Sequence, residues 1–153
     1  MDVTYHVDDA EVKAMLKKLE RKAKTMKPAM NDISVYMKHE VMDNFKSQGR
    51  PNKWQPLSEK YSKYKSESAG AGKPILEFHG KLKQSINAKH TNDNAMVRTG
   101  VKYGVYHQTG TRKMPARPFM PDKKNPNMPP FDTKGINRIK RIIELYLTRE
   151  VNV

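Results

Sequence analysis

The sequence predicts an α+β protein in which helices pack on one face of a small antiparallel β-sheet, with long loops and a C-terminal helix. Apolar residues recur at helical spacing in three segments, two near the N-terminus and one at the C-terminal end. Between them, two short segments separated by a polar turn have the pattern of a hairpin. A length of 153 residues favours a single domain, 1–153, whose core removes roughly two-thirds of the unfolded surface from water.

The N-terminal elements follow from periodicity. Residues 3–7, "VTYHV", alternate apolar and polar side chains, which predicts a short strand. Asp8 or Asp9 can then cap a helix. The apolar stripe of that helix consists of Val12, Met15, Leu16 and Leu19.

A second helix is predicted to begin near Pro28, because proline is tolerated in a first helical turn. Gly49 and Pro51 end it. Its stripe comprises Met30, Ile33, Met37, Val41 and Phe45. The methionines are interpreted as adaptable core filling rather than a ligand groove.

Residues 48–74 have the composition of a loop, with a flexible segment at 66–73. Its large anchors are Trp54, Leu57, Tyr61 and Tyr64. Two interpretations are open. The aromatic residues and the interleaved lysines could stack bases and follow phosphates, as in single-strand binders. The favoured interpretation is that Trp54, Leu57 and Tyr61 pin a long loop to the core.

Residues 81–90 and 94–101 are predicted to form a hairpin around the turn "TNDN". Its expected inward-facing residues are Leu82, Ile86, Met96 and Val101.

Six of the ten prolines lie within 115–130, which excludes a helix or a central strand there and predicts an extended surface arm at 121–131. A last helix follows Asp132 or Thr133, and its apolar face contains Ile136, Ile139, Ile143 and Tyr146.

Thirty basic and sixteen acidic residues give a net charge of +14. The excess lies in the middle of the chain, where ten basic and three acidic residues give +7 over 46–90, and seven and two give +5 over 91–131. This concentration of positive charge favours binding to polyanions such as DNA. The alternative is that the lysines only form a solvated surface, which would have the same composition. Because the start is acidic and has no apolar run, neither a signal peptide nor a membrane span is expected.

The residues provide little for catalysis. The five histidines lack metal-ligand spacing, and there are no cysteines. The serines lack a GxSxG elbow, no glycine-rich phosphate loop is present, and the carboxylates in the middle of the chain are not clustered. We therefore expect no enzyme activity, no metal and no cofactor.

Three motifs occur in order: "KWQPLSEKYSKYK", "PILEFHGKLKQSI" and "VRTGVKYGVYHQTGTRKMPARPFM". Together they resemble the phage virion morphogenesis family of Mu-type tail-completion proteins, over about residues 45–120. The matching positions are Trp54, Pro56, Leu57, Leu76, Gly80, Leu82, Ser85, Ile86, Tyr103, His107, Gly110, Pro115, Ala116, Arg117 and Phe119. The proline-rich arm after Met120 departs from the pattern.

The resemblance implies a structural protein that completes the tail and joins it to the head, at the head-proximal end and as a ring around the DNA channel. The implied partners are tail tube or tail terminator proteins, head-completion or connector proteins, and further copies of the chain. The implied location is the tail or neck of the virion, and the host cytoplasm during assembly. The alternative is a basic, sequence-nonspecific nucleic-acid-binding protein.

The stretch from Tyr103 to Met120 is predicted to be scaffold with an exposed tip. Tyr106 and His107 would begin a packed turn, and Gly110 would take a positive φ. Arg112 and Lys113 would form the tip, and "PARPF" would return as an edge strand with Phe119 in the core. Arg117 is either a buried cation that bonds backbone carbonyls, which is favoured, or an interface residue. His107 is expected to be a satisfied core histidine rather than a proton donor.

Overall fold

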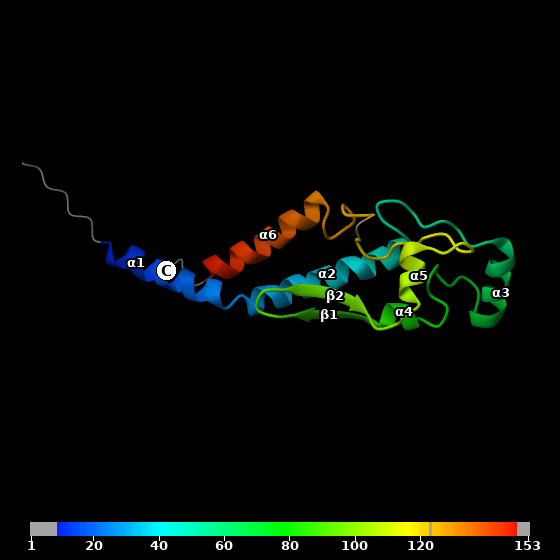
Figure 1. Ribbon diagram of the computed structural model, residues 1–153, viewed down its shortest axis with the longest axis horizontal. Coiled ribbons are helices and arrows are strands. Elements are labelled where there is room, and N and C mark those ends of the chain that lie inside the picture. The colour runs from blue at the N-terminus through cyan, green and yellow to red at the C-terminus, as the bar shows by residue number, and fades with distance from the viewer. Residues whose placement is uncertain (1–8, 123, 150–153) are drawn as a thin grey trace, which may run out of the picture.

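The computed structural model describes residues 9–122 and 124–149. Its elements are α1 (Ala10–Lys24), α2 (Lys27–Ser47), α3 (Glu59–Ala69), α4 (Lys81–Gln84), β1 (Ile86–His90), β2 (Ala95–Thr99), α5 (Gly104–Thr109) and α6 (Thr133–Thr148). The hairpin and α6 both contact α2, and α6 also contacts α1 (Figure 1). The predicted α+β class is therefore confirmed. The predicted strand at 3–7 lies outside the described residues.

The central helix, α2, begins as expected, with proline in its first turn. Along its stripe, Ile33, Val41 and Phe45 are buried, whereas Met30 and Met37 are half-buried. The chain leaves the helix through Gln48 at φ 58°, and the Gln48 and Gly49 N–H groups bond the carbonyls of the last turn. This left-handed exit turns the chain back toward the body, where Trp54 enters the core.

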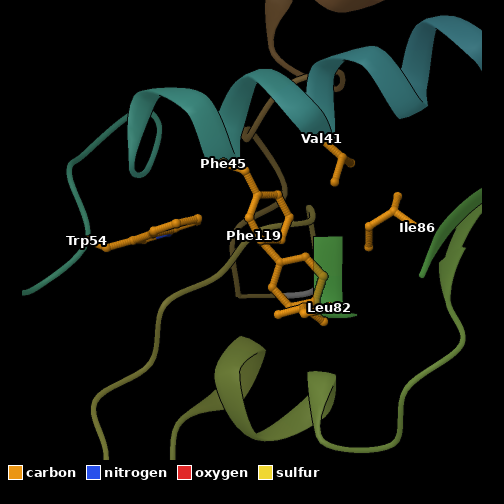
Figure 2. Close-up of a cluster of buried hydrophobic side chains, with 6 residues drawn as sticks. All are labelled: Val41, Phe45, Trp54, Leu82, Ile86 and Phe119. Carbon is orange, nitrogen blue, oxygen red and sulfur yellow. The ribbon is translucent and has the colours of Figure 1, made fainter. Parts of the chain in front are cut away.

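The main core lies around the C-terminal half of α2 (Figure 2). It consists of Val41, Phe45, Trp54, Leu82, Ile86 and Phe119. The Phe45 ring lies 5.6 Å from the Trp54 ring and 5.4 Å from the Phe119 ring. Three separate segments thus meet on one helix, and the Trp54 indole N–H also donates to the Pro118 carbonyl at 2.8 Å.

The hairpin is shorter than predicted. Residues 81–84 form α4 rather than strand, after Gly80 at φ +75° starts the turn. β1 and β2 pair antiparallel, with Ile86 opposite Thr99, and the turn closes with a bond from the Thr91 N–H to the Asn94 carbonyl. Met96 is 39% exposed, so its predicted inward position is wrong. Alternation along β2 instead turns Val97 toward the core, which it contacts together with Val101.

Residues 59–69 correct the loop predicted at 48–74, because they form α3, and this helix includes the first part of the supposed flexible segment 66–73. Ser58 caps α3 by accepting a bond from the Tyr61 N–H at 3.3 Å. Within the helix only Lys65 is buried. A helix that is polar on nearly every side carries no apolar stripe, so periodicity did not reveal it.

Two predictions for the proline-rich region need correction. "PARPF" forms no strand, because the N–H groups of Phe119 and Met120 bond to the Gln108 side chain at 3.1 Å rather than to a neighbouring strand. The arm at 121–131 is not confined to the surface, since Met128 and Pro130 are buried. The predicted absence of a helix or a central strand in this region agrees with the structure.

The last helix is capped by Asp132, whose carboxylate accepts a bond from the Gly135 N–H at 2.9 Å. α6 runs back along α2 toward α1, so that the C-terminal end of the described chain lies beside α1 (Figure 1). There Lys22 donates to the Tyr146 carbonyl at 3.1 Å, and the Tyr146 hydroxyl donates to the Thr25 carbonyl. Within the described residues, no helix is long and apolar enough to cross a membrane.

Candidate functional site

A pocket of about 770 Å³ opens at the end of the molecule opposite α1, among α3, α4 and α5. Its walls come from four segments: the loop after Trp54 with the first turns of α3, residues 76–82, α5 with its N-cap, and residues 113–117. The apolar wall residues are Pro56, Leu57, Tyr61, Leu76, Phe78, Leu82, Tyr103, Met114 and Pro115. A volume of this size accommodates several side chains of a ligand.

The residues predicted from the motifs converge on this pocket. It is lined by Pro56, Leu57, Gly80, Tyr103, His107, Lys113, Pro115 and Arg117. Trp54 and Phe119 lie behind it in the core. Arg112 is exposed at the tip, where Thr111 and Met114 close a short turn. Segments far apart in the sequence therefore build one site, which periodicity alone could not reveal.

Arg117 is a buried cation, 5% exposed. Its Nε donates to the Gln55 carbonyl at 2.9 Å and its Nη2 to the Pro56 carbonyl at 3.0 Å. These bonds fix the loop after Trp54 against residues 115–119. This is the geometry of the favoured interpretation, a cation that bonds backbone carbonyls.

Lys65 is a second buried cation, 4% exposed, which the sequence did not distinguish from its neighbours on α3. Its ammonium group donates to the Lys73 carbonyl at 3.1 Å and to the Pro74 carbonyl. Burial lowers the pKa of Lys65, and nearby Glu77 partly opposes the shift. The lysine thus holds the chain after α3 against the pocket wall.

His107 is not the satisfied core histidine that was expected. It is half-buried on α5, and its Nδ1 is buried without a hydrogen-bond partner. Burial lowers the pKa of His107, and the positive charge of Arg117 lowers it further. The imidazole is therefore neutral at pH 7, and it packs edge-on against the Tyr103 ring at 5.9 Å.

Two further residues predicted from the motifs, Gly110 and Ser85, shape the backbone around the pocket. Gly110 takes φ +74°, and a side chain there would place its Cβ 2.7 Å from the Ala116 nitrogen. The Ser85 hydroxyl donates to the Leu82 carbonyl at 2.7 Å and lies 2.7 Å from the Thr99 hydroxyl, joining α4 to β2. Both residues hold the frame behind the pocket.

Sequence reasoning missed the role of Gln108. Its side-chain oxygen accepts from the Phe119 and Met120 N–H groups, and its amide donates to Asp122 at 2.8 Å. Burial opposes ionisation of Asp122, but hydrogen bonds from the Gln108 and Asn125 side chains and from the Asn125 and Lys124 N–H groups lower its pKa. The one available signal was the position of Gln108 inside the "HQTG" motif.

The charged lining of the pocket is mainly basic. Its lining includes one carboxylate, Glu77, which accepts a bond from Lys83 at 2.9 Å. Across residues 9–122 and 124–149, no group of three or more histidine, aspartate or glutamate side chains is placed to hold a metal ion. What the geometry defines is a small α+β protein with a pocket whose lining is apolar and positively charged.

The family then follows from comparison. The chain matches the phage virion morphogenesis family over residues 7–147, and it belongs to that family. The resemblance seen in the motifs is thereby confirmed. The protein takes part in phage virion assembly, and membership of this family suggests a structural rather than a catalytic role.

Two relatives come from a prophage of Haemophilus influenzae. The chain is 29% identical to Mu-like prophage FluMu G protein 1 over 97% of both chains. It is 28% identical to Mu-like prophage FluMu G protein 2, over 72% of this chain and 76% of that protein. No solved structure shows a significant match.

Proposed function

We propose that this protein completes the phage tail and joins it to the head, acting as a ring around the DNA channel at the head-proximal end. The supporting observation is the match to the virion morphogenesis family over residues 7–147, together with similarity to a Mu-like prophage protein along nearly the whole chain. The proposed partners are tail tube or tail terminator proteins on one side and head-completion or connector proteins on the other. The proposal includes no catalytic step and no cofactor.

Exposed apolar side chains support a role in assembly. On α1, Val12 is 55% exposed, Met15 44% and Leu16 58%. On α6, Leu145 is 51% exposed. An isolated helix of this length is marginal in water, so a neighbouring protein that covers these faces would stabilise both helices.

Electron microscopy of a lysate tests the proposal. A phage whose gene carries an early stop codon should yield DNA-filled heads beside complete, unattached tails. Supplying the wild-type protein from a plasmid should restore joined virions, which controls for effects on downstream genes. Normal virions without the protein, or empty heads alone, would contradict a role at the junction.

The net charge of +14 favours one alternative, sequence-nonspecific binding to nucleic acid. In the virion, the same charge could contact phage DNA in the channel. The aromatic residues do not strengthen this alternative, because Trp54 is 5% exposed and its indole N–H is bonded within the core. Tyr61 and Tyr64 remain exposed on α3.

A further inference from the structure

The pocket carries an unbalanced positive charge. Its ionisable lining includes four lysine or arginine side chains, Lys65, Lys81, Lys113 and Arg117, against the single carboxylate of Glu77. That carboxylate is already paired with Lys83. Among the ion pairs of the described residues, none includes Lys65 or Arg117, which donate to backbone carbonyls instead. Because buried charges without a counter-charge are costly, an incoming carboxylate would relieve this cost.

A second feature is the orphaned nitrogen of His107. Its Nδ1 is buried and has no partner, and the ring lines the same pocket as Arg117. A ligand with a polar group at this depth would satisfy an atom that the protein itself leaves unpaired. The nitrogen accepts or donates a hydrogen bond depending on the tautomer, so it marks a polar lining, and it is the two buried cations that favour an acidic ligand.

The walls restrict the ligand further. Leu57, Phe78 and Met114 offer apolar surface between the charged groups. A phosphodiester backbone would neutralise the cations but leave this surface facing water. A peptide that carries both carboxylates and apolar side chains matches both properties.

Such a peptide occurs in the chain itself. Residues 1–12 contain Asp2, Asp8, Asp9 and Glu11 and no lysine or arginine, in a protein whose net charge is +14. Val3, Tyr5 and Val7 lie between the acidic residues. The most acidic stretch of the sequence thus also has side chains suited to the apolar walls.

The segment cannot reach the pocket of its own copy. α1 has 15 residues and α2 has 21, which at the α-helical rise correspond to about 22 Å and about 31 Å. The two helices follow one another along the molecule, and the pocket lies beyond the far end of α2 (Figure 1). Nine residues span at most roughly 30 Å even when fully extended. Only the pocket of a second copy is within reach.

We propose that residues 1–9 of one copy bind the pocket of the next copy, with Asp2 and Asp8 meeting the lysine and arginine side chains and the apolar side chains meeting the walls. Asp9, which pairs with Lys13 of its own helix at 2.6 Å, marks where the bound segment ends. The contact joins two different surfaces, so repetition produces a closed ring or an open filament. This inference rests on the proposed ring and names the contact that would form it. It also accounts for how one positively charged chain can associate with itself.

A labelled peptide provides the direct test. A fluorescent peptide of residues 1–9 is titrated with the full-length protein, and anisotropy reports binding. We expect saturable binding that weakens roughly tenfold or more when the three aspartates are changed to asparagine. Absence of saturable binding, or equal binding of the asparagine peptide, would overturn the proposal.

Charge reversal on the protein locates the binding site. Lys81 and Lys113 are exposed side chains on the pocket rim, so Lys81→Glu with Lys113→Glu should weaken peptide binding roughly tenfold or more and leave the melting temperature unchanged. The matched control, Lys134→Glu with Lys140→Glu on α6, makes the same change in net charge away from the pocket. Equal losses in both variants would mean attraction by overall charge and would exclude a specific site.

Two further measurements separate the remaining outcomes. A peptide with Asp2→Lys and Asp8→Lys should bind the protein with Lys81→Glu and Lys113→Glu better than it binds the wild-type protein. If it does not, the aspartates of the segment do not pair with the lysines of the pocket rim. A short single-stranded oligonucleotide should not displace the wild-type peptide at physiological salt. Displacement would mean that the pocket binds nucleic acid instead.

The two proposals can fail separately. If the peptide does not bind but the stop-codon phage still leaves tails unattached, the contact between copies is wrong while the proposed role at the head-tail junction is supported.

Discussion

At the scale of single residues, Phe119 shows how one side chain holds several segments together. It is 2% exposed and packs on Phe45 of α2, although its own segment has no regular secondary structure. Its backbone N–H bonds to Gln108 on α5. The residue therefore links α2, α5 and the proline-rich segment.

Replacing Phe119 with alanine should lower the free energy of unfolding by about 3–5 kcal/mol, because it removes a buried ring and leaves a cavity. Urea denaturation followed by circular dichroism measures the change. The control is Tyr106→Ala on α5, where the side chain is 56% exposed and the effect should be within about 1 kcal/mol. Native-like stability of the Phe119 variant would show that the segment does not pack as described.

His107 should make stability depend on pH. Burial and the charge of Arg117 lower its pKa in the folded protein below the ordinary value of 6.5. The unfolded chain therefore takes up the proton first as the pH falls, so the contribution of this residue is complete above pH 6.5 and is lost progressively below it.

The expected result for His107→Gln is a shallower loss of stability between pH 7 and pH 5, measured by urea denaturation at each pH. The matched control is His79→Gln, which changes an exposed histidine on the same pocket and should keep the wild-type profile. A pH profile of the His107 variant that parallels the wild type would contradict the assigned burial.

At the scale of elements, the helices differ in how far their apolar stripes are covered. The stripe of α2 is buried where it meets the hairpin and the core, whereas α1 has no buried residue. On α6, Ile139, Ile143 and Tyr146 are half-buried and Ile136 is 40% exposed. Periodicity predicted all three helices, but it did not distinguish the covered stripes from those left open.

The N-cap of α6 provides a test at this scale. Asp132→Ala removes the acceptor for the Gly135 N–H and should destabilise the protein by about 1 kcal/mol, as judged from thermal or urea unfolding. Asp132→Ser retains a capping oxygen and should recover most of that loss. If alanine and serine behave alike, the cap does not contribute to the stability of α6.

At the scale of the whole molecule, the charge of +14 predicts a salt-dependent affinity for DNA. Lysine and arginine side chains that bind phosphates release counterions from the DNA, so the affinity of the protein for DNA should fall steeply as the salt concentration rises. We expect binding of a short duplex at 50 mM salt that becomes negligible near 200 mM, measured by fluorescence anisotropy. Tight, stoichiometric binding at physiological salt would favour nucleic-acid binding as the main function.

The pocket and the open helix faces lie at opposite ends of an elongated molecule, with α1 and the end of α6 on one side and α3, α4 and α5 on the other (Figure 1). Such a layout suits contacts that join one end of a subunit to the other end of its neighbour. The arrangement is visible only in three dimensions, because the pocket draws its lining from residues 55–117.

The sequence by itself determined the amphipathic helices, the polar turn of the hairpin, a cap at Asp132 or Thr133, the burial of Phe119 and the family resemblance. These features are local or rest on ordered motifs, so spacing and residue type are sufficient to predict them. Only the tertiary structure decided that residues 59–69 are helical, that "PARPF" is not a strand, and that Arg117 bonds carbonyls about sixty positions away. It also brought eight of the predicted site residues together in the lining of one pocket. The reason is that a buried cation, a proline-rich segment and a polar helix take their conformations from partners distant in the chain, and residue spacing contains no information about those partners.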